Sequence, residues 1–468
     1  MSVTTSRMSV TTSRKNALIG WWRRIDAAKL AFRCSAVVGV FLLGGVFATL
    51  ELQPYQMFED GYRAARLFYS ELTQTRPLLV EPRVYAGDGV TVHDADAISR
   101  GLTAMQGLFP EGVELRLVDM AGKVVHRWRA DFHAIWPDPA HVFPQSNVPI
   151  DDLHYHTQGM ALLPDGSVVL NFSMLGTVKL DKCGSVQWTL DRLTHHSVTP
   201  NPDGTFWIPA KRDVRDVPED LMLEGVSADS LDESDARYED RLLQVSADGK
   251  VIRVLSVLRA VFEGGLAPEL HDMTETSRAD PTHVNDIEVV TPALARRIDG
   301  VEAGDLLVSI RQMHMLAILD KNTGALKWRR SGPWIRQHDP DITADGLIEV
   351  FNNGDRHLAV DGVRGSSIIA LDPATGETDT VYPRDESRYF FTELMGTHQL
   401  LPNGNRLITE SQAGRVFEVN PVGKIVWEYV KPYDDTHAVL IEKALRYGEG
   451  YFTVENWSCP EPAGRHRD

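Results

Sequence analysis

Five histidines recur near the start of a repeated unit of the chain, and they are the side chains whose spacing first suggests chemistry. They are His156, His196, His283, His338 and His398. An imidazole can act as a nucleophile, a proton donor or a proton acceptor near neutral pH. Arg356, Asn285 and Asn352 lie close to them in the sequence, and such cationic and hydrogen-bonding groups suit an anionic ligand. We therefore interpret the set as candidate catalytic and substrate-binding residues.

The positions of four of these histidines predict that they face the same way. They precede the next hairpin turn by eight residues for His156, six for His196 and His338, and four for His398. If the intervening residues are extended, even offsets place the side chains on one face. An insertion prevents the same comparison for His283. The alternative is that the repeat position holds a packing residue, because a single histidine in a strand is most often structural.

An internal repeat supplies the elements that must position these histidines. The pattern is an apolar residue, an Asp, Asn or Ser, a Gly-containing turn and a returning apolar run. Its six copies are VDMAGKVVHRW from Val118, LDKCGSVQW from Leu180, VSADGKVIRV from Val245, LDKNTGALKW from Leu319, LDPATGETDTV from Leu371 and VNPVGKIVW from Val419. A second set of hairpins built on Asp-Gly or Asn-Gly lies between the copies.

Two hairpins per repeat make a four-stranded unit, and six such units favour an all-β, six-bladed β-propeller over a solenoid or two sandwiches. We place it at residues 101–457, with 458–468 as a tail. Little chain precedes the first copy, so we expect the stretch around 436–456 to complete the first blade. The innermost strand of each blade lines the channel, where the histidines would converge.

The N-terminal region predicts a membrane anchor. Residues 1–33 contain seven basic side chains against one acidic, and 34–52 form an apolar segment near the lower length limit for a spanning helix. This order predicts a basic cytoplasmic leader, a single-pass inner-membrane helix and a propeller in the periplasm or outside the cell. A cleaved signal peptide or a buried core helix are the alternatives. Residues 53–100 are expected to form a helical linker.

Composition excludes some classes of function. The net charge of −17 opposes nucleic-acid binding, and no G-x-x-x-x-G-K loop for a nucleotide occurs. We expect no cofactor and no metal, because an arginine beside converging imidazoles would disfavour a metal ion. Cys183 and Cys459 could pair in an oxidising compartment, although two free thiols are equally compatible with the sequence.

Three segments of the chain resemble the arylsulfotransferase family, the bacterial sulfotransferases that need no nucleotide donor. They are 280–285 (DPTHVN), 337–338 (QH) with 351–356 (FNNGDR), and 396–398 (GTH). The resemblance spans about residues 110–455 and implies a six-bladed propeller. It also implies that sulfuryl moves from an aryl sulfate to a phenol through a sulfated histidine. By this match His398 would be the nucleophile, with His283, His338 and Arg356 supporting it.

The chain departs from the family at its N-terminus, where an anchor and linker replace a small β-domain, and it lacks a closely spaced cysteine pair. These departures leave the substrate class and a homo-oligomeric state open. His156, His196, Asn285 and Asn352 complete the expected substrate-binding set. The competing functions are a non-catalytic propeller that binds an anionic ligand or glycan, and a metalloenzyme built on the imidazoles.

Overall fold

The computed structural model describes residues 35, 38–39, 76–77, 79–143, 145–212, 216–223, 238–271, 280–360, 362–384 and 388–460. The chain divides into two compact units, 1–75 and 76–468, and everything below concerns the second. The expected leader lies outside the described residues, as does almost all of the expected anchor. No helix among the described residues is both long and apolar enough to cross a membrane.

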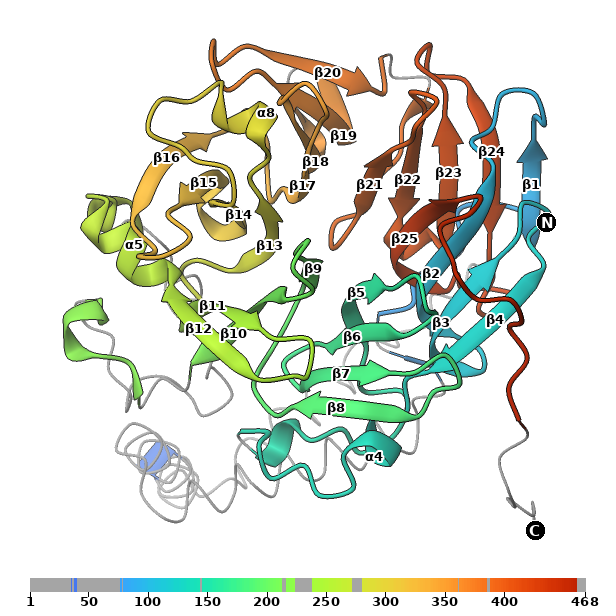
Figure 1. Ribbon diagram of the computed structural model, residues 1–468, viewed down its shortest axis with the longest axis horizontal. Coiled ribbons are helices and arrows are strands. Elements are labelled where there is room, and N and C mark those ends of the chain that lie inside the picture. Colours follow the sequence, from blue (N-terminus) through green and yellow to red (C-terminus); the bar gives the residue numbers. More distant parts are fainter. Residues whose placement is uncertain are drawn as a thin grey trace, which may run out of the picture. The chain divides into compact units, whose positions relative to one another are not determined.

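Six antiparallel sheets stand around a common centre in the described part of the chain, as the blades of a propeller (Figure 1). From the centre outward, blade 1 contains β25 (Leu440–Gly448), β2 (Gly101–Phe109), β3 (Gly112–Val118) and β4 (Val124–Arg129). Blade 2 contains β5 (Thr157–Leu162), β6 (Val168–Phe172), β7 (Gly176–Leu180) and β8 (Val186–Leu190). Blade 3 contains β9 (Thr199–Pro200), β10 (Phe206–Arg212), β11 (Glu239–Val245) and β12 (Val251–Ser256).

The other three blades follow in chain order. Blade 4 contains β13 (Val284–Val289), β14 (Leu306–Ile310), β15 (Met315–Leu319) and β16 (Leu326–Ser331). Blade 5 contains β17 (His338–Ile342), β18 (Ile348–Val360), β19 (Val363–Leu371) and β20 (Thr378–Tyr382). Blade 6 contains β21 (Thr397–Leu400), β22 (Arg406–Glu410), β23 (Arg415–Val419), β24 (Ile425–Val430) and, outermost, β1 (Gly89–His93). The first-named strands of the six blades contact one another in a ring, which confirms the six-bladed propeller.

Short helices lie in the connections between strands. They are α4 (Phe132–Ile135), η1 (Gln145–Asn147), η3 (Glu219–Leu221), α5 (Val257–Glu263), α6 (Ala267–His271), α8 (Pro292–Ala295), η5 (Arg311–Met313) and η7 (Ser411–Ala413). The helix α5 begins at a cap in which the Ser256 hydroxyl accepts a hydrogen bond from the Arg259 amide. The strands therefore carry the fold, and the helices cover its connections.

The hairpins form where Asp-Gly and Asn-Gly pairs predict them. In the turn between β5 and β6, Gly166 has a φ of +80°, and the Asp165 carboxylate accepts the amide of Ser167 at 2.9 Å. Only glycine adopts this backbone conformation without a steric penalty. The turn chemistry therefore sets the register of each inner hairpin locally.

The apolar core is divided among the six junctions between neighbouring blades. Each cluster of buried side chains joins two adjacent blades; between blades 5 and 6 it contains Phe351, Tyr382, Phe390 and Phe417. Truncating such a buried ring to alanine costs about 3–5 kcal/mol in other proteins. Trp207 and Trp334 belong to clusters of this kind, so neither lines the channel.

The C-terminal segment closes the ring, as the sequence predicts. β25 pairs antiparallel with β2, so the last strand of the chain is the innermost strand of the first blade (Figure 1). This pairing joins parts of the chain that are more than 330 residues apart, and it leaves no open blade at the junction.

One boundary from the sequence is wrong. We expected the linker to remain helical to residue 100, but Gly89–His93 forms β1, which pairs with β24 as a fifth strand of blade 6. The segment alternates Val90 and Val92 with polar residues, and Val90 packs on the apolar cluster between blades 6 and 1. The propeller therefore begins before residue 101, because this strand covers the edge of the last blade.

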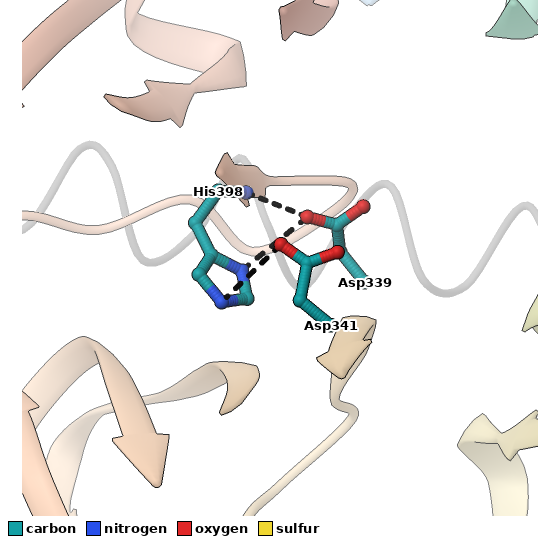
Figure 2. A group of neighbouring side chains, drawn as sticks. All are labelled: Asp339, Asp341 and His398. Carbon is teal, nitrogen blue, oxygen red and sulfur yellow. Dashed lines mark hydrogen bonds and ion pairs between the residues drawn. The ribbon is translucent and has the colours of Figure 1, made fainter. Parts of the chain in front are cut away.

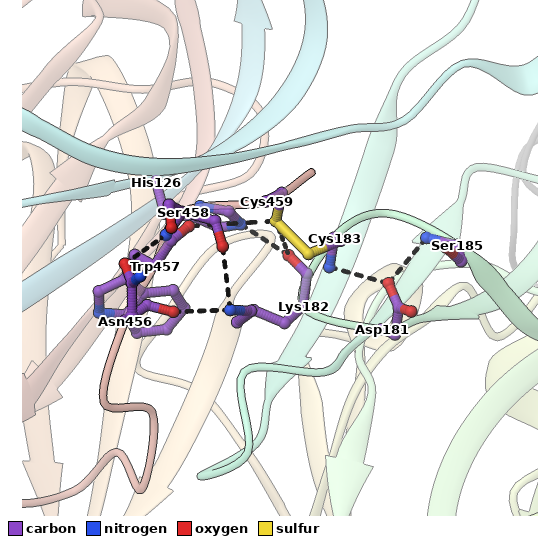
Figure 3. The surroundings of a disulfide bond; sticks show 9 residues. All are labelled: His126, Asp181, Lys182, Cys183, Ser185, Asn456, Trp457, Ser458 and Cys459. Atoms are coloured by element: carbon purple, nitrogen blue, oxygen red, sulfur yellow. Dashed lines mark hydrogen bonds between the residues drawn. A yellow bond between two sulfur atoms is a disulfide. The ribbon is translucent and has the colours of Figure 1, made fainter. Parts of the chain in front are cut away.

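A disulfide bond joins Cys183 in the β7–β8 turn to Cys459 near the C-terminus (Figure 3). Around it the Lys182 ammonium donates to the carbonyl oxygens of Asn456 at 2.6 Å and Ser458 at 3.2 Å. The segment that follows β25 is thus attached to blade 2 by one covalent bond and by hydrogen bonds.

Candidate functional site

The inner strands converge on a cavity of about 260 Å³. Four of the five recurring histidines line it: His156 just before β5, His196 shortly before β9, His283 just before β13, and His338 as the first residue of β17. The other lining residues are Leu79, Gln158, Ser173, Met174, His195, Lys211, Asp280, Arg311, Leu394 and Met395. We call this cavity the histidine pocket.

Several residues around the histidine pocket have left-handed backbone conformations. His196 and His283 have φ angles of +53° and +44°, and Met174 and Met395 both have +61°. Residues with side chains adopt this region rarely and at an energetic cost. Strain at four positions around one cavity makes this cavity our candidate functional site.

His283 is oriented by a carboxylate. Its Nδ1 lies 2.5 Å from Asp280 Oδ2, and the Lys211 ammonium lies 2.5 Å from Asp280 Oδ1. Burial opposes ionisation of Asp280, but Lys211 and His283 hold the pKa of that carboxyl far below its ordinary value. An ionised carboxylate accepts the Nδ1 proton of His283, which leaves a lone pair on Nε2.

His338 is held in the same tautomer by different partners. Its Nδ1 lies 2.7 Å from Asn353 Oδ1 and 3.0 Å from the Arg336 carbonyl, and both of these atoms only accept. The Asn353 amide nitrogen donates to the carbonyls of Thr392 and Met395, which fixes the amide with its oxygen toward the ring. Burial and the nearby cation Arg311 lower the pKa of His338 to about 3. The ring is therefore neutral, with an unprotonated Nε2.

His196 belongs to a chain of polar groups that runs away from the pocket. His196 Nδ1 lies 2.8 Å from His195 Nδ1, and His195 Nε2 lies 2.9 Å from Asp240 Oδ1. The Asp240 carboxylate beside Nε2 favours a proton on that nitrogen of His195, which leaves His195 Nδ1 to accept the Nδ1 proton of His196. Burial lowers the pKa of His196 well below its ordinary value. Its ring centroid lies 5.2 Å from that of His283 and 6.3 Å from that of His338, so the three rings are neighbours in the pocket.

Two cations line the same pocket, and neither belongs to the sequence-predicted set. Lys211 is buried and bridges Asp240 at 2.8 Å and Asp280 at 2.5 Å, so its charge is compensated. Arg311 makes no ion pair within the described part of the chain, and it donates only a long hydrogen bond of 3.4 Å to Gln312. The Arg311 guanidinium is therefore the cation best able to bind an anionic group of a ligand.

His398 is not in the histidine pocket. Its ring is 0% exposed and lies among carboxylates: Nδ1 is 3.3 Å from Asp339, and Nε2 is 3.8 Å from Asp341 and 3.7 Å from Glu349 (Figure 2). Burial opposes protonation, but Asp341 and Asp339 raise the pKa of His398 above its ordinary value. A protonated imidazole has no lone pair, so this environment does not suit a nucleophile.

Arg356 and the two asparagines also lie apart from the pocket. Arg356 is exposed on β18, with its guanidinium carbon 4.6 Å from the ring centre of Phe391. Asn352 is fully buried, and its side chain bonds to Ser367 and to the Ile335 amide, which is a structural role. Asn285 donates to the Gln337 carbonyl at 2.7 Å and lines a small cavity of about 40 Å³ beside the histidine pocket.

A match to a protein-family model shows which family the chain belongs to. The model of arylsulfotransferase (ASST) matches residues 159–432, which is more than half of the chain. The chain belongs to the arylsulfotransferase family. Membership of this family implies a sulfotransferase. No curated protein matches the chain.

Solved structures with related folds are distant. A protein of unknown function from Bacteroides caccae shares 11% identity over 73% of this chain and 99% of its own, with a TM-score of 0.45. A streptogramin B lyase shares 13% over 75% of this chain and 86% of its own, with a TM-score of 0.39. Virginiamycin B lyase from Staphylococcus aureus shares 9% over 60% and 71%, with a TM-score of 0.33. These values are too low to carry an argument about the activity of this arylsulfotransferase-family chain.

Proposed function

We propose that this protein transfers a sulfuryl group from an aryl sulfate ester to a phenolic acceptor in the histidine pocket, through a sulfated His283. The pair of Asp280 and His283 carries the proposal, because the carboxylate holds the ring through Nδ1 and leaves Nε2 as the nitrogen that can attack. Two histidines of the pocket lie against an aspartate, His195 and His283. The side chain of His283 is the more accessible of the two, with 28% exposed against 3% for His195. Family membership supplies the reaction class.

In the first step the Nε2 lone pair of His283 attacks the sulfur atom and forms an N–S bond. The S–O bond to the aryl group breaks, and the phenolate leaves with that electron pair. The ring becomes positively charged while its Nδ1 proton stays on the hydrogen bond to Asp280. The Asp280 carboxylate stabilises this charge, and the Arg311 guanidinium stabilises the sulfuryl oxygens.

In the second step the acceptor phenol attacks the same sulfur atom, the N–S bond breaks, and the electron pair returns to Nε2 of His283. The acceptor loses its proton to water as its oxygen attacks, because the pKa of His338, about 3, makes that ring too weak a base to keep it. The departed donor phenolate takes up a proton from water, so the complete cycle neither gains nor loses protons. Splitting one displacement into two follows the usual logic of covalent catalysis.

The walls of the pocket suit an aryl group. Leu79, Met174, Leu394 and Met395 add apolar surface to the lining that the histidines and Arg311 make polar. A flexible thioether packs favourably against an aromatic ring. The sulfate end of a donor and its ring thus have separate surfaces to contact.

The family resemblance assigns the nucleophile to His398, and the geometry favours His283 instead. Both predictions can be tested in one experiment with 4-nitrophenyl sulfate and no acceptor, stopped rapidly and followed by peptide mapping at alkaline pH. We expect one equivalent of 4-nitrophenol in the burst and the sulfuryl group on the peptide that contains His283. The His283→Gln variant should lose the burst.

A matched control is His154→Gln, because His154 also pairs with an aspartate three residues earlier, Asp151, but lies outside the pocket. This control should keep the burst. A label on the His398 peptide would refute the assignment to His283. Tight binding of aryl sulfates without any release of nitrophenol would refute transfer and favour an anion-binding function.

The proposal includes an exported propeller anchored in the inner membrane by residues 34–52. The disulfide Cys183–Cys459 supports an oxidising compartment, where such bonds persist. A fusion of the C-terminus to a reporter active only outside the cytoplasm should be active, and the protein should sediment with membranes. An inactive fusion would exclude export.

A further inference from the structure

A second polar group lies on the inner strands, and it is dominated by carboxylates. Asp286 and Glu288 of β13, Asp339 and Asp341 of β17, and Glu349 of β18 are near enough to affect one another's ionisation or that of His398. The cations among them are Lys443, Arg406 and the His398 ring. Even with His398 protonated, carboxylates outnumber cations. Burying like charges together is unfavourable unless a further cation or protons compensate them.

Among the described residues, Asp339, Asp341 and His398 form a group that offers three ligand atoms within 4.8 Å of one another. They project toward each other from β17 and β21 (Figure 2). Zinc-like ions bind such atoms at about 2.0–2.2 Å, which puts neighbouring ligand atoms roughly 3.0–3.5 Å apart. His398 Nδ1 lies 3.3 Å from Asp339 and His398 Nε2 lies 3.8 Å from Asp341; an ion takes only one of these nitrogens, so the second carboxylate must move closer to reach it.

The His398 ring provides an independent indication. The residue is 1% exposed, and neither ring nitrogen has a hydrogen-bond partner among the described residues. The nearest carboxylate oxygens are too distant or poorly aligned for hydrogen bonds, although they surround the ring. A buried imidazole with both nitrogens unsatisfied is costly, and binding a metal ion through one nitrogen removes part of that cost.

The neighbouring residues fix the two carboxylates differently. The Lys443 ammonium donates to Asp339 Oδ1 at 3.1 Å, and the His398 amide donates to Asp339 Oδ2 at 2.6 Å, so Asp339 is held in place. The Asp341 side chain is 32% exposed, which gives an ion and its water ligands access to the site. Anchored ligands with an accessible face are typical of protein metal sites.

We propose that Asp339, Asp341 and His398 bind a divalent metal ion that accepts both oxygen and imidazole ligands, such as Mn²⁺ or Zn²⁺. The ion compensates the carboxylates of blades 4 and 5 and connects β17 to β21, so it stabilises the junction between blades 5 and 6. The proposal does not depend on the sulfuryl transfer assigned to the histidine pocket.

The test uses the purified propeller-containing protein, stripped with a chelator and then titrated with MnCl₂ or ZnCl₂. We expect one equivalent of metal per chain by elemental analysis after gel filtration, and a rise in the midpoint of thermal unfolding. His398→Gln and the near-isosteric Asp341→Asn should each weaken binding at least tenfold and reduce the thermal shift.

The control His133→Gln removes an exposed histidine from α4 and should leave the stoichiometry unchanged. Because Asp341 is partly exposed, Asp341→Asn should fold even if His398→Gln does not, and circular dichroism checks both. Absence of a stoichiometric metal from the wild type after titration would overturn the proposal. Equal affinity in the wild type, Asp341→Asn and His398→Gln would overturn it too, since the ion would then bind elsewhere.

Discussion

Removing the carboxylate charge of Asp280 tests the proposed chemistry most directly. Asp280→Asn keeps the size of the side chain but removes the negative charge that lies beside His283 Nδ1. An asparagine can also present its NH₂ group to Nδ1, which would move the ring proton to Nε2 and remove the nucleophilic lone pair. Lys211 keeps its second partner, Asp240, at 2.8 Å, so the buried ammonium is not left unpaired.

The size of the effect follows from Coulomb's law. During sulfation the His283 ring gains about one positive charge, centred roughly 4 Å from the carboxylate charge, and at an effective dielectric constant near 20 this attraction is about 4 kcal/mol. Each 1.4 kcal/mol corresponds to a tenfold change in rate, so we expect kcat to fall about 10³-fold. The Michaelis constant should change little, because the charge develops only on the way to the transition state.

The assay is rapid mixing with 4-nitrophenyl sulfate, following release of nitrophenol. Asp151→Asn is the matched control: Asp151 lies 2.5 Å from His154 with the same sequence spacing, outside the pocket. If folded Asp280→Asn keeps its kcat within tenfold of the wild type, the carboxylate does not stabilise the reacting ring and the reasoning fails.

Three further predictions concern other features of the molecule. Arg311→Met should lower kcat/KM about 10²–10³-fold for the aryl sulfate and by a similar factor for the phenol, because the guanidinium would contact the same sulfuryl oxygens in both half-reactions; an unchanged kcat/KM for either substrate in ping-pong kinetics would contradict this. Burial lowers the pKa of His156 to about 4, below the unfolded value, so the native state binds fewer protons and loses stability as the pH falls from about 6.5 to 4. In urea unfolding, the stability of the wild type relative to His156→Gln should therefore decrease by about 3 kcal/mol from pH 7 to pH 4, and parallel pH profiles would show that the ring is not buried in its neutral form. Cys459→Ser should lower the free energy of unfolding by about 2–4 kcal/mol, because the bond to Cys183 closes a chain segment of 276 residues; dithiothreitol should reproduce the loss in the wild type, and identical unfolding midpoints before and after reduction would contradict it.

The architecture was predictable because its signals are local and repeated. Each hairpin is encoded by a turn of a few residues, and six copies at regular spacing leave few alternatives. Closure by β25 was predictable as well, because the first repeat lacked an innermost strand of its own. The pairing of β1 with β24 was not, since it joins Gly89–His93 to a strand more than 330 residues away and no turn sequence marks it.

The polar residues of the histidine pocket were only partly predictable. His156, His196, His283 and His338 share a repeat position, so their convergence follows from the fold. No sequence motif marks Lys211 or Arg311. Lys211 lies next to the last residue of β10 and Arg311 directly follows β14, and only the folded ring of blades brings the two side chains to the same cavity. The role of Lys211 depends on its ion pair with Asp280, which precedes the next blade, and no spacing in the sequence encodes that contact.

The misplacement of His398 has a specific physical cause in the strand register. In the pairing of β5 with β6 and of β17 with β18, the register shifts between the histidine and the hairpin turn that follows it. The pairing of β21 with β22 has no such shift from Thr397 to Leu400. An extra residue in a bulge reverses which face the following side chains occupy. Even offsets, six residues for His338 and four for His398, therefore end on opposite faces in β17 and β21. His338 turns to the histidine pocket and His398 turns to the carboxylates of blade 5, which is why the two rings differ in protonation and, by our proposals, in chemistry.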